Sequence, residues 1–172
     1  NCVEIPGKWW RNFWTKATLR VCNRVIAQTK DQQKLLRQNL GVPSVVFPSV
    51  IELSKFNGAE NVTFASRDID VLWVGTIEPR KGIENFLNLA EMTPELTFSA
   101  IGGPAVGGRN YFNEIRDRAN RLDNVYMGGF VEPDQVVLWM KRSKSLLHTS
   151  VPVHAGLTKE GFPNVFLESW AS

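Results

Sequence analysis

The stretch that decides the fold is residues 70–82, DVLWVGTIEPRKG, in which the apolar run VLWV ends directly on Gly75. A short apolar run bounded by glycine is typical of a buried strand, and the helical spacing at 82–92 predicts a helix after it. The same alternation returns along the chain, with strands expected at 96–101, 125–127 and 145–148 and helices at 110–121, 134–142 and from 164 onward. Alternating strands and helices predict an α/β fold with a parallel sheet and helices on both faces.

In such a sheet, the positions that bind ligands lie in the loops that follow the strands. Ligands bind beyond the carboxyl ends of the strands, where helix N-termini also present unpaired N–H groups. Three predicted strands end on glycine, at Gly75, at residues 102–103 and at residues 128–129. The loops expected to converge on a ligand are 76–81, 104–109, 130–133 and 150–164.

The first of these loops carries two adjacent cations, Arg80 and Lys81, where a helix is expected to begin, with Pro79 suited to its first turn. A cation at a helix N-terminus opposes the macrodipole at a cost of roughly 0.3–1 kcal/mol. A bound anion would remove this cost. Because arginine supplies a planar fork and lysine a mobile charge, a mono- or diphosphate is the expected ligand. Two solvated surface cations remain the alternative.

The last loop enters a helix at about Pro163 or Asn164, with Glu160 before it and Glu168 inside it. Beside a phosphate, a carboxylate 4 Å away is repelled by about 1 kcal/mol in water and about 4 kcal/mol at an effective dielectric of 20. The two glutamates are therefore expected to bind neutral donors such as sugar and ribose hydroxyls. Taken alone, two glutamates at this spacing more often belong to a solvated helix face.

Together these residues resemble the retaining, two-Rossmann-domain (GT-B) nucleotide-sugar glycosyltransferases often called group 1. Residues 74–82, VGTIEPRKG, are similar to the V-G-x-x-x-x-x-K-G segment of that family, and residues 160–168, EGFPNVFLE, match its E-x7-E signature. Between them the segments 101–104, 125–131 and 146–150 occur in the expected order. The resemblance covers residues 18–172 and implies a Rossmann-like fold, the incomplete C-terminal half of a GT-B enzyme.

The resemblance also implies roles for individual residues. Lys81 would contact the donor diphosphate with Arg80 as its helper, and Glu160 would hold hydroxyls of the donor sugar, so Lys81 and Glu160 are the catalytic candidates. Glu168 would bind the ribose, and Val131 would lie by the base. Backbone N–H groups in the last loop are expected to bind the sugar or phosphate, within the segment Phe162, Pro163, Asn164 and Val165.

One position departs from the family pattern. Many members carry arginine at the place of Thr76, where it is the second cation that binds the diphosphate. Thr76 keeps its place among the expected substrate-binding residues, and Arg80 is expected to supply the missing charge. No metal is expected, since the cations and the helix dipole would stabilise the departing diphosphate.

The resemblance divides the chain near residue 52. Residues 1–52, with short strands at 24–29 and 45–48, are expected to be the end of an N-terminal, acceptor-side domain and the interdomain linker. Residues 53–172 are expected to be a truncated C-terminal nucleotide-sugar-binding domain, so the chain is expected to be part of a longer polypeptide. Residues 8–24 predict a basic amphipathic helix, which either docks on an anionic membrane surface or packs against other parts of the protein.

The composition limits the classes of partner that the protein can have. The 172 residues are 43% hydrophobic and 22% charged, as in a globular protein, and the net charge of +3 is too small to indicate a nucleic-acid partner. The two cysteines and two histidines lack metal-ligand spacing. Because no apolar run reaches the roughly 18 residues of a membrane span, a cytoplasmic location is expected, peripheral on the inner face of the membrane if the helix at 8–24 docks there.

The predicted function is transfer of a hexosyl group, of mannosyl or glucosyl type, from a nucleotide diphosphate sugar to a carbohydrate or lipid-linked acceptor, as in polysaccharide biosynthesis. The family implies retention of configuration and no cofactor. The alternative is a non-catalytic nucleotide-sugar-binding or membrane-docking module. An NAD-type oxidoreductase would need G-x-G-x-x-G after the first strand, and a glycosidase would leave the Arg80–Lys81 pair without a purpose.

Overall fold

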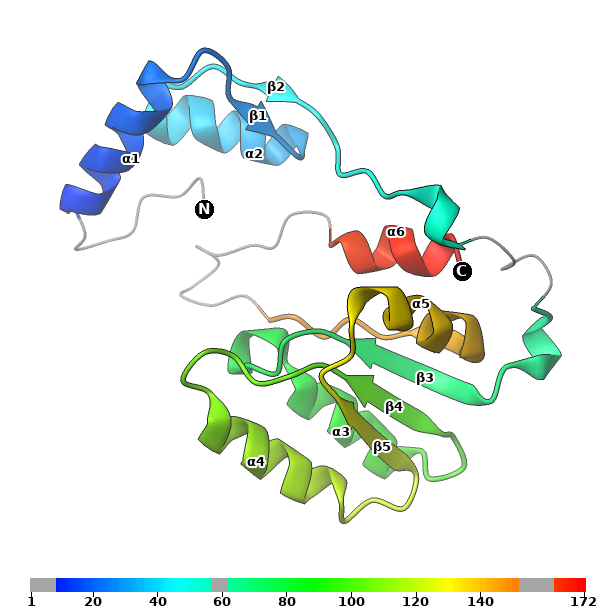
Figure 1. Ribbon diagram of the computed structural model, residues 1–172. Coiled ribbons are helices and arrows are strands. Elements are labelled where there is room, and N and C mark those ends of the chain that lie inside the picture. The colour runs from blue at the N-terminus through cyan, green and yellow to red at the C-terminus, as the bar shows by residue number, and fades with distance from the viewer. Residues whose placement is uncertain (1–8, 57–61, 152–162) are drawn as a thin grey trace. The chain divides into compact units, whose positions relative to one another are not determined.

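The computed structural model describes residues 9–56, 62–151 and 163–172 (Figure 1). It separates into two compact units. The described part of the first unit is essentially residues 9–50. The second unit is formed by the described residues of Ile51–Val151 together with Val165–Ser172.

The second unit is built on a four-stranded, fully parallel sheet with the strand order β5-β4-β3-β6. The strands are β3 (Ile69–Val74), β4 (Phe98–Ile101), β5 (Val125–Gly129) and β6 (Ser143–Leu146). The helices that follow them are α3 (Ile83–Met92), α4 (Arg109–Ala119), α5 (Pro133–Arg142) and α6 (Asn164–Trp170). The expected alternation of strands and helices is confirmed.

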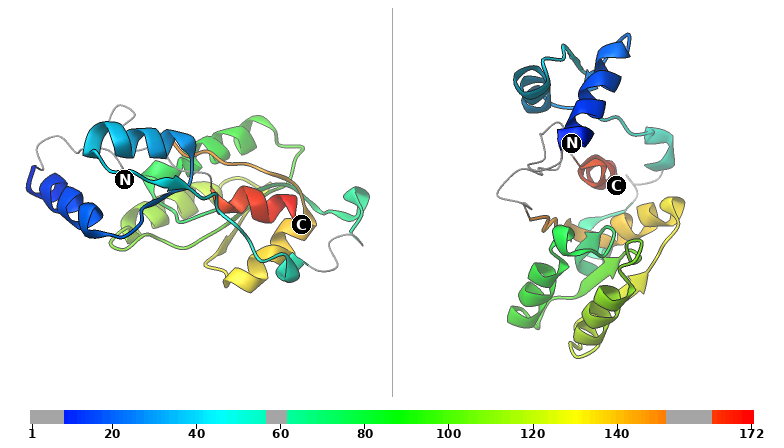
Figure 2. Two further views of the ribbon diagram at one scale, coloured as in Figure 1. Left: turned by 90° about the horizontal axis from the view of Figure 1, so that it is seen from above. Right: turned by 90° about the vertical axis from the view of Figure 1, so that its left-hand side faces the viewer.

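Helices cover both faces of this sheet, as expected, and the right-hand view of Figure 2 shows α3 and α4 on one side and α5 and α6 on the other. On the first face Trp73 and Phe98 pack on α3, where the rings of Phe86 and Phe98 meet edge to face at 5.3 Å. On the second face Leu72 and Ile101 pack with Met140 of α5. The central strands are therefore buried on both sides, which explains their continuous apolar runs.

The last strand lies two residues earlier than the apolar pattern predicted. Strand β6 begins at Ser143, which pairs with Ile69, and the expected strand 145–148 is wrong at both ends. Ser143 is buried and donates to Trp139 O, whereas Lys144 and Ser145 are exposed, as suits an edge strand. Leu147 still donates its N–H to Leu72 O at 2.8 Å, so the chain stays alongside β3 after the strand ends.

The first unit contains α1 (Trp9–Val21) and two short parallel strands, β1 (Ile26–Ala27) and β2 (Val45–Val46). Between the strands α2 (Lys30–Leu35) continues as a π-helical turn, η1 (Leu36–Leu40). Thr29 Oγ1 accepts the Gln32 N–H at 3.1 Å and so caps the N-terminus of α2, while Gly41, at φ 66°, ends the helix. Both are common signals of helix ends.

The segment before the sheet forms two 3₁₀ turns, η2 (Leu53–Phe56) and η4 (Phe64–Ser66), which the sequence pattern did not predict. Single 3₁₀ turns are too short to produce a hydrophobic period. Phe56 is buried, and Arg67 donates to Ser143 O at 2.6 Å and to Ser172 O at 3.3 Å. These contacts attach the segment to the second unit.

Among residues 9–56, 62–151 and 163–172, none of the helices combines the length and the hydrophobicity that crossing a bilayer requires.

Candidate functional site

Glycines at the carboxyl end of the sheet let three strand ends approach one another. Gly75 donates its N–H to Ile101 O at 3.1 Å, and Gly102 donates to Gly129 O at 2.7 Å. A Cβ added to Gly102, whose φ is 151°, would lie 1.7 Å from Gly75 O. Only glycine fits there, because any side chain would overlap the neighbouring backbone.

A cavity of about 170 Å³ opens beside these glycines. Its walls come from the ends of β3, β4 and β5 and from the start of α5: Val74, Gly75, Thr76, Ile101, Gly102, Gly103, Phe130, Val131 and Val136. An apolar cavity of about 150 Å³ holds a benzene-sized ring, whereas whole-ligand sites span roughly 300–1,000 Å³. The cavity therefore has room for one ring of a larger ligand.

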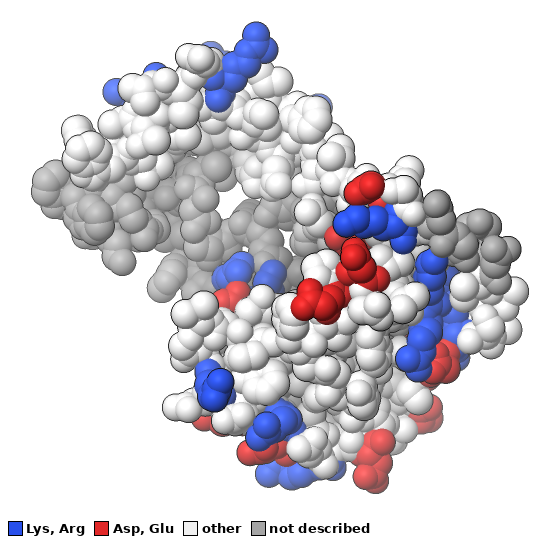
Figure 3. Space-filling model, in the orientation of Figure 1, with Lys and Arg blue, Asp and Glu red and all other residues white. Residues whose placement is uncertain are grey.

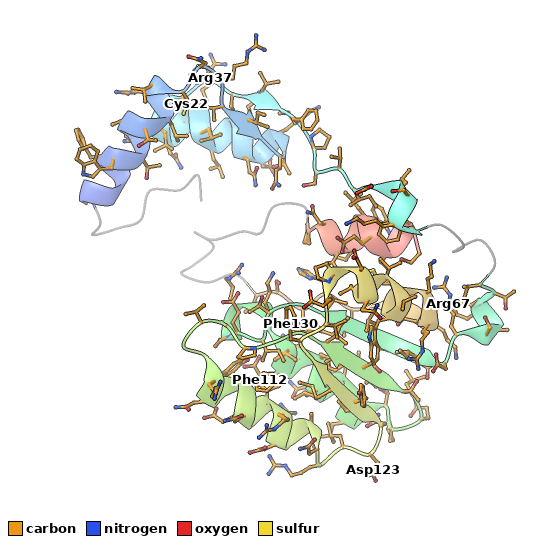
Figure 4. The ribbon with its side chains drawn as sticks, viewed as in Figure 1. Cys22, Arg37, Arg67, Phe112, Asp123 and Phe130 are labelled. Carbon is orange, nitrogen blue, oxygen red and sulfur yellow. The ribbon has the colours of Figure 1, made fainter. Side chains whose placement is uncertain are left out.

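Two of the predicted site residues, Thr76 and Val131, meet in the wall of this cavity. Phe130, which the sequence analysis did not single out, stands beside them with 71% of its surface exposed, and Figure 4 marks its place. An exposed aromatic ring at the mouth of an apolar cavity can stack on a planar ligand. The signal available in the sequence was an aromatic residue directly after a strand that ends in glycine.

The basic loop has a different backbone from the one expected. Pro79, Arg80 and Lys81 form a 3₁₀ turn, η5, and Gly82 follows in the left-handed region at φ 62°. The α-helix α3 therefore starts only at Ile83, and the expectation that the two cations stand in its first turn is wrong. The glycine interrupts the helical backbone between the turn and the helix, so the cations lie just before the positive end of α3.

Within this loop a carboxylate accompanies the cations. Arg80 Nη2 donates to Glu78 Oε1 at 2.6 Å, and the Glu78 side chain is 27% exposed. The three side chains of Glu78, Arg80 and Lys81 together carry one net positive charge. Glu78 had no predicted role, because nothing in the local pattern indicates which way Arg80 turns.

The same loop is attached to the glycine-rich loop after β4. Ile77 is fully buried, donates its N–H to Gly103 O at 2.9 Å and pairs with Pro104 in a parallel bridge. The start of the glycine-rich loop is thereby held against the first loop. Both loops sit at the carboxyl edge of the sheet, beside the cavity.

The residues of the E-x7-E segment are described only in part. Glu160 and Phe162 lie outside the described residues. Helix α6 begins at Asn164, after Pro163, as predicted. The Val165 side chain packs on the cluster of Leu72 and Ile101. Glu168 is half-buried on α6, and its backbone oxygen accepts a hydrogen bond from Ser172 Oγ at 2.8 Å.

A comparison with known protein families shows to which family the chain belongs. A family model described as "Glycosyl transferases group 1" matches residues 56–172, more than half of the sequence. The chain belongs to the group 1 glycosyl transferases. The resemblance based on residues 74–82 and 160–168 is therefore confirmed at the level of the family.

Similar proteins agree with this membership. The alpha-galactosylglucosyldiacylglycerol synthase of Streptococcus pneumoniae (strain ATCC BAA-255 / R6) is 33% identical over 70 residues, 38% of this chain and 18% of that protein. Anabaena Alr3699/HepE, solved with UDP and glucose, has a TM-score of 0.66 at 20% identity, covering 94% of this chain and 47% of the other. The pneumococcal O-GlcNAc transferase GtfA, solved with UDP and GlcNAc, has a TM-score of 0.62 at 17% identity, covering 92% and 30%.

These structural likenesses are to GT-B glycosyltransferases and establish the Rossmann-like fold of this group 1 glycosyl transferase. The chain spans less than half the length of each of these three proteins. Within the described part of the chain, no three His, Cys, Asp or Glu side chains gather as ligands of a metal ion would.

Proposed function

We propose that this group 1 glycosyl transferase chain is the donor-binding part of a retaining hexosyltransferase of mannosyl or glucosyl type. The donor would be a nucleotide diphosphate sugar, and the acceptor a carbohydrate or a lipid-linked sugar, as in polysaccharide biosynthesis. The observation that carries the proposal is the ring-sized cavity at the carboxyl ends of β3, β4 and β5, next to the basic loop. In this proposal residues 53–172 bind the donor, and residues 1–52 end the acceptor-side half and link the two.

The nucleobase would occupy the cavity. Thr76 and Val131 would line it and Phe130 would cover one face of the ring, since both valine and phenylalanine are apolar and close to the mouth. A volume of about 170 Å³ suits a single six-membered ring better than a fused pair. We therefore favour a pyrimidine, and the UDP named with the Anabaena and pneumococcal structures supports this choice.

The diphosphate would bind at the basic loop. Lys81 would contact it directly, and Arg80 would assist while it remains paired with Glu78. A nucleoside diphosphate needs no general acid to leave once its charge is compensated, so electrostatic stabilisation by Lys81, Arg80 and the positive end of α3 would supply the chemistry without a metal.

The E-x7-E segment would supply the remaining contacts with the donor. Glu160 would hold hydroxyls of the sugar and stabilise positive charge at its anomeric carbon, and Glu168 would hold the ribose. Backbone groups of the segment 162–165 would complete the sugar or phosphate site. Carboxylates suit hydroxyl donors because a charge-assisted hydrogen bond is about twice as strong as a neutral one.

Calorimetric titration of the full-length protein tests the proposal. UDP-glucose, UDP-N-acetylglucosamine and GDP-mannose would each be titrated with and without EDTA. We expect the UDP sugars to bind more tightly than GDP-mannose, with no change on chelation. Binding of none of them contradicts the donor site, tighter binding of GDP-mannose contradicts the one-ring cavity, and loss with EDTA contradicts metal independence.

We also propose that this protein is cytoplasmic and that residues 8–24 attach it to the inner face of the membrane. The first 50 residues contain eight Lys or Arg and two Asp or Glu, a net charge of +6, whereas the other 122 residues contain twelve and fifteen, a net charge of −3. On the face in Figure 3, acidic residues accompany the basic ones only over the second unit. In α1, Phe13 is 59% and Trp14 63% exposed, as suits insertion among lipid headgroups.

Vesicle co-sedimentation of the full-length protein tests this second proposal. Each Lys or Arg near an anionic surface contributes about 1 kcal/mol, so Arg20→Gln with Arg24→Gln should reduce binding to vesicles rich in phosphatidylglycerol roughly thirtyfold. The matched control is Arg116→Gln with Arg118→Gln on α4, which should bind like the wild type. Equal binding to neutral phosphatidylcholine vesicles, or no effect of replacing Arg20 and Arg24, would contradict anionic docking.

A further inference from the structure

A buried tryptophan at the end of β3 directs its one polar group toward the loop after β6. Trp73 is 2% exposed, and its indole Nε1–H donates to Thr149 Oγ1 at 2.9 Å. A buried indole N–H needs such a partner, because leaving it unpaired costs about 1–3 kcal/mol. The partner lies 76 residues further along the chain.

The Thr149 hydroxyl in turn reaches the basic loop. Thr149 Oγ1 donates to Lys81 O at 2.8 Å, and two residues later the Val151 N–H donates to Arg80 O at 3.0 Å. A Cβ on Gly82 would lie 2.3 Å from Thr149 O, so the two backbones are in close contact. One short segment, residues 149–151, thus satisfies both carbonyl groups of the cation pair.

The Trp73 indole, the Thr149 hydroxyl and the Lys81 carbonyl fix the donor and the acceptor in each of these two hydrogen bonds. An indole N–H only donates and a backbone carbonyl only accepts, so the residue between them must do both through a single atom. Among side chains of this size, only the hydroxyl of threonine or serine does so. Consecutive hydrogen bonds also polarise and strengthen one another.

The turn that carries the cations is short, and two backbone hydrogen bonds close it. Inside η5 the bonds are Lys81 N–H to Glu78 O at 2.9 Å and Gly82 N–H to Pro79 O at 3.1 Å. A three-residue 3₁₀ turn is weak by itself. If its backbone fluctuated, the cost of ordering it would be subtracted from the binding energy of the ligand.

We propose that Thr149, acting with Trp73, is a positioning residue that fixes the backbone of Arg80 and Lys81 and thereby orients Lys81 toward the donor phosphates. This inference rests on the proposed function for the place of the diphosphate. The hydrogen bonds and the close contact at Gly82 carry the positioning itself. Thr149 contacts no substrate in this scheme and acts through the loop.

The test uses the full-length protein with Thr149→Val, which keeps the side-chain shape and removes the hydroxyl, and Thr149→Ser, which restores it. Titration with UDP and UDP-glucose should show affinity reduced roughly three- to tenfold in Thr149→Val, the value of one hydrogen bond, and near wild type in Thr149→Ser. In a Lys81→Ala background, Thr149→Val should have no further effect, because the residue acts through Lys81.

Hydrogen–deuterium exchange without ligand gives a second readout that does not depend on donor binding. Amides of the segment 79–85, in which Pro79 carries no N–H, should exchange faster in Thr149→Val and in Trp73→Phe. The matched control is Thr97→Val at the opposite edge of the sheet, where Thr97 Oγ1 donates to Asp70 Oδ2 at 2.9 Å. It should change neither the exchange of 79–85 nor the donor affinity.

The outcomes separate the two proposals. A wild type that binds no nucleotide sugar contradicts the proposed function, while faster exchange at 79–85 in Thr149→Val would still support the positioning of the loop. Unchanged exchange in that variant overturns the positioning role whatever the donor does. A loss of affinity that persists undiminished in the Lys81→Ala background overturns the action through Lys81.

Discussion

Replacing Gly102 by alanine should lower the free energy of unfolding by about 3 kcal/mol, a large effect for one methyl group. The added Cβ would lie 1.7 Å from Gly75 O, and φ at this residue is 151°, where alanine is strained. The obstacle is backbone, so no side-chain rotation relieves it. For a unit of this size the change corresponds to a fall in Tm of about 15 °C, measured by thermal unfolding monitored with circular dichroism.

The same variant should also impair donor binding, because Gly102 lines the cavity proposed for the base. The matched control is Gly107→Ala in the same loop. Gly107 also has a positive φ, 75°, but a Cβ there meets no atom within 4 Å. It should cost only about 1 kcal/mol and leave donor affinity unchanged. A Tm for Gly102→Ala equal to that of Gly107→Ala would show that the strand ends separate easily.

Replacing Lys81 by alanine should weaken binding of UDP-glucose roughly ten- to a hundredfold, as expected when a hydrogen bond to a charged group is lost. Arg80 compensates only in part, because its guanidinium is shared with Glu78 at 2.6 Å. Uridine, which has no phosphate, should bind the variant and the wild type equally. Calorimetric titration with both ligands measures the difference.

Lys144→Ala is the matched control for the lost charge. Lys144 lies in β6 and pairs with Asp70 at 2.7 Å, a contact that, with bonds from Thr97, lowers the pKa of that carboxyl to about 2. This pair belongs to the amino end of the sheet, away from the cavity. Donor affinity should therefore stay at the wild-type value. If Lys144→Ala weakens binding as much as Lys81→Ala, the effect reflects net charge rather than a phosphate contact.

Most elements of the second unit could be predicted from local patterns. The run 71–74 followed by Gly75 predicted β3, and the helical spacing after it predicted α3 to within one residue. The edge strand β6 was displaced by two residues because its polar start carries no apolar signal. The two cations were expected at the start of α3 but lie in a separate 3₁₀ turn, because Gly82 at φ 62° interrupts the helical backbone and sequence alone does not specify the sign of a glycine φ.

The residues of the candidate site could likewise be predicted only in part. Thr76 and Val131 could be proposed from their places after strands, and the structure brings them into one wall. Phe130 and Glu78 were missed, since an exposed aromatic and a surface glutamate have ordinary local explanations. Thr149 could not be found at all from its neighbours in sequence, because its partners are Trp73 and Lys81.

Local periodicity and strand-ending glycines are sufficient to specify an α/β architecture and the edge of the sheet where ligands bind. They act over a few residues, through backbone sterics and the burial of one face, and can be read in a single pass along the chain. The width of the cavity and the position of the basic loop do not follow from such local signals. They depend on the register that sets Gly102 against Gly75 and Thr149 beside Lys81, and register is a property of strands packed together.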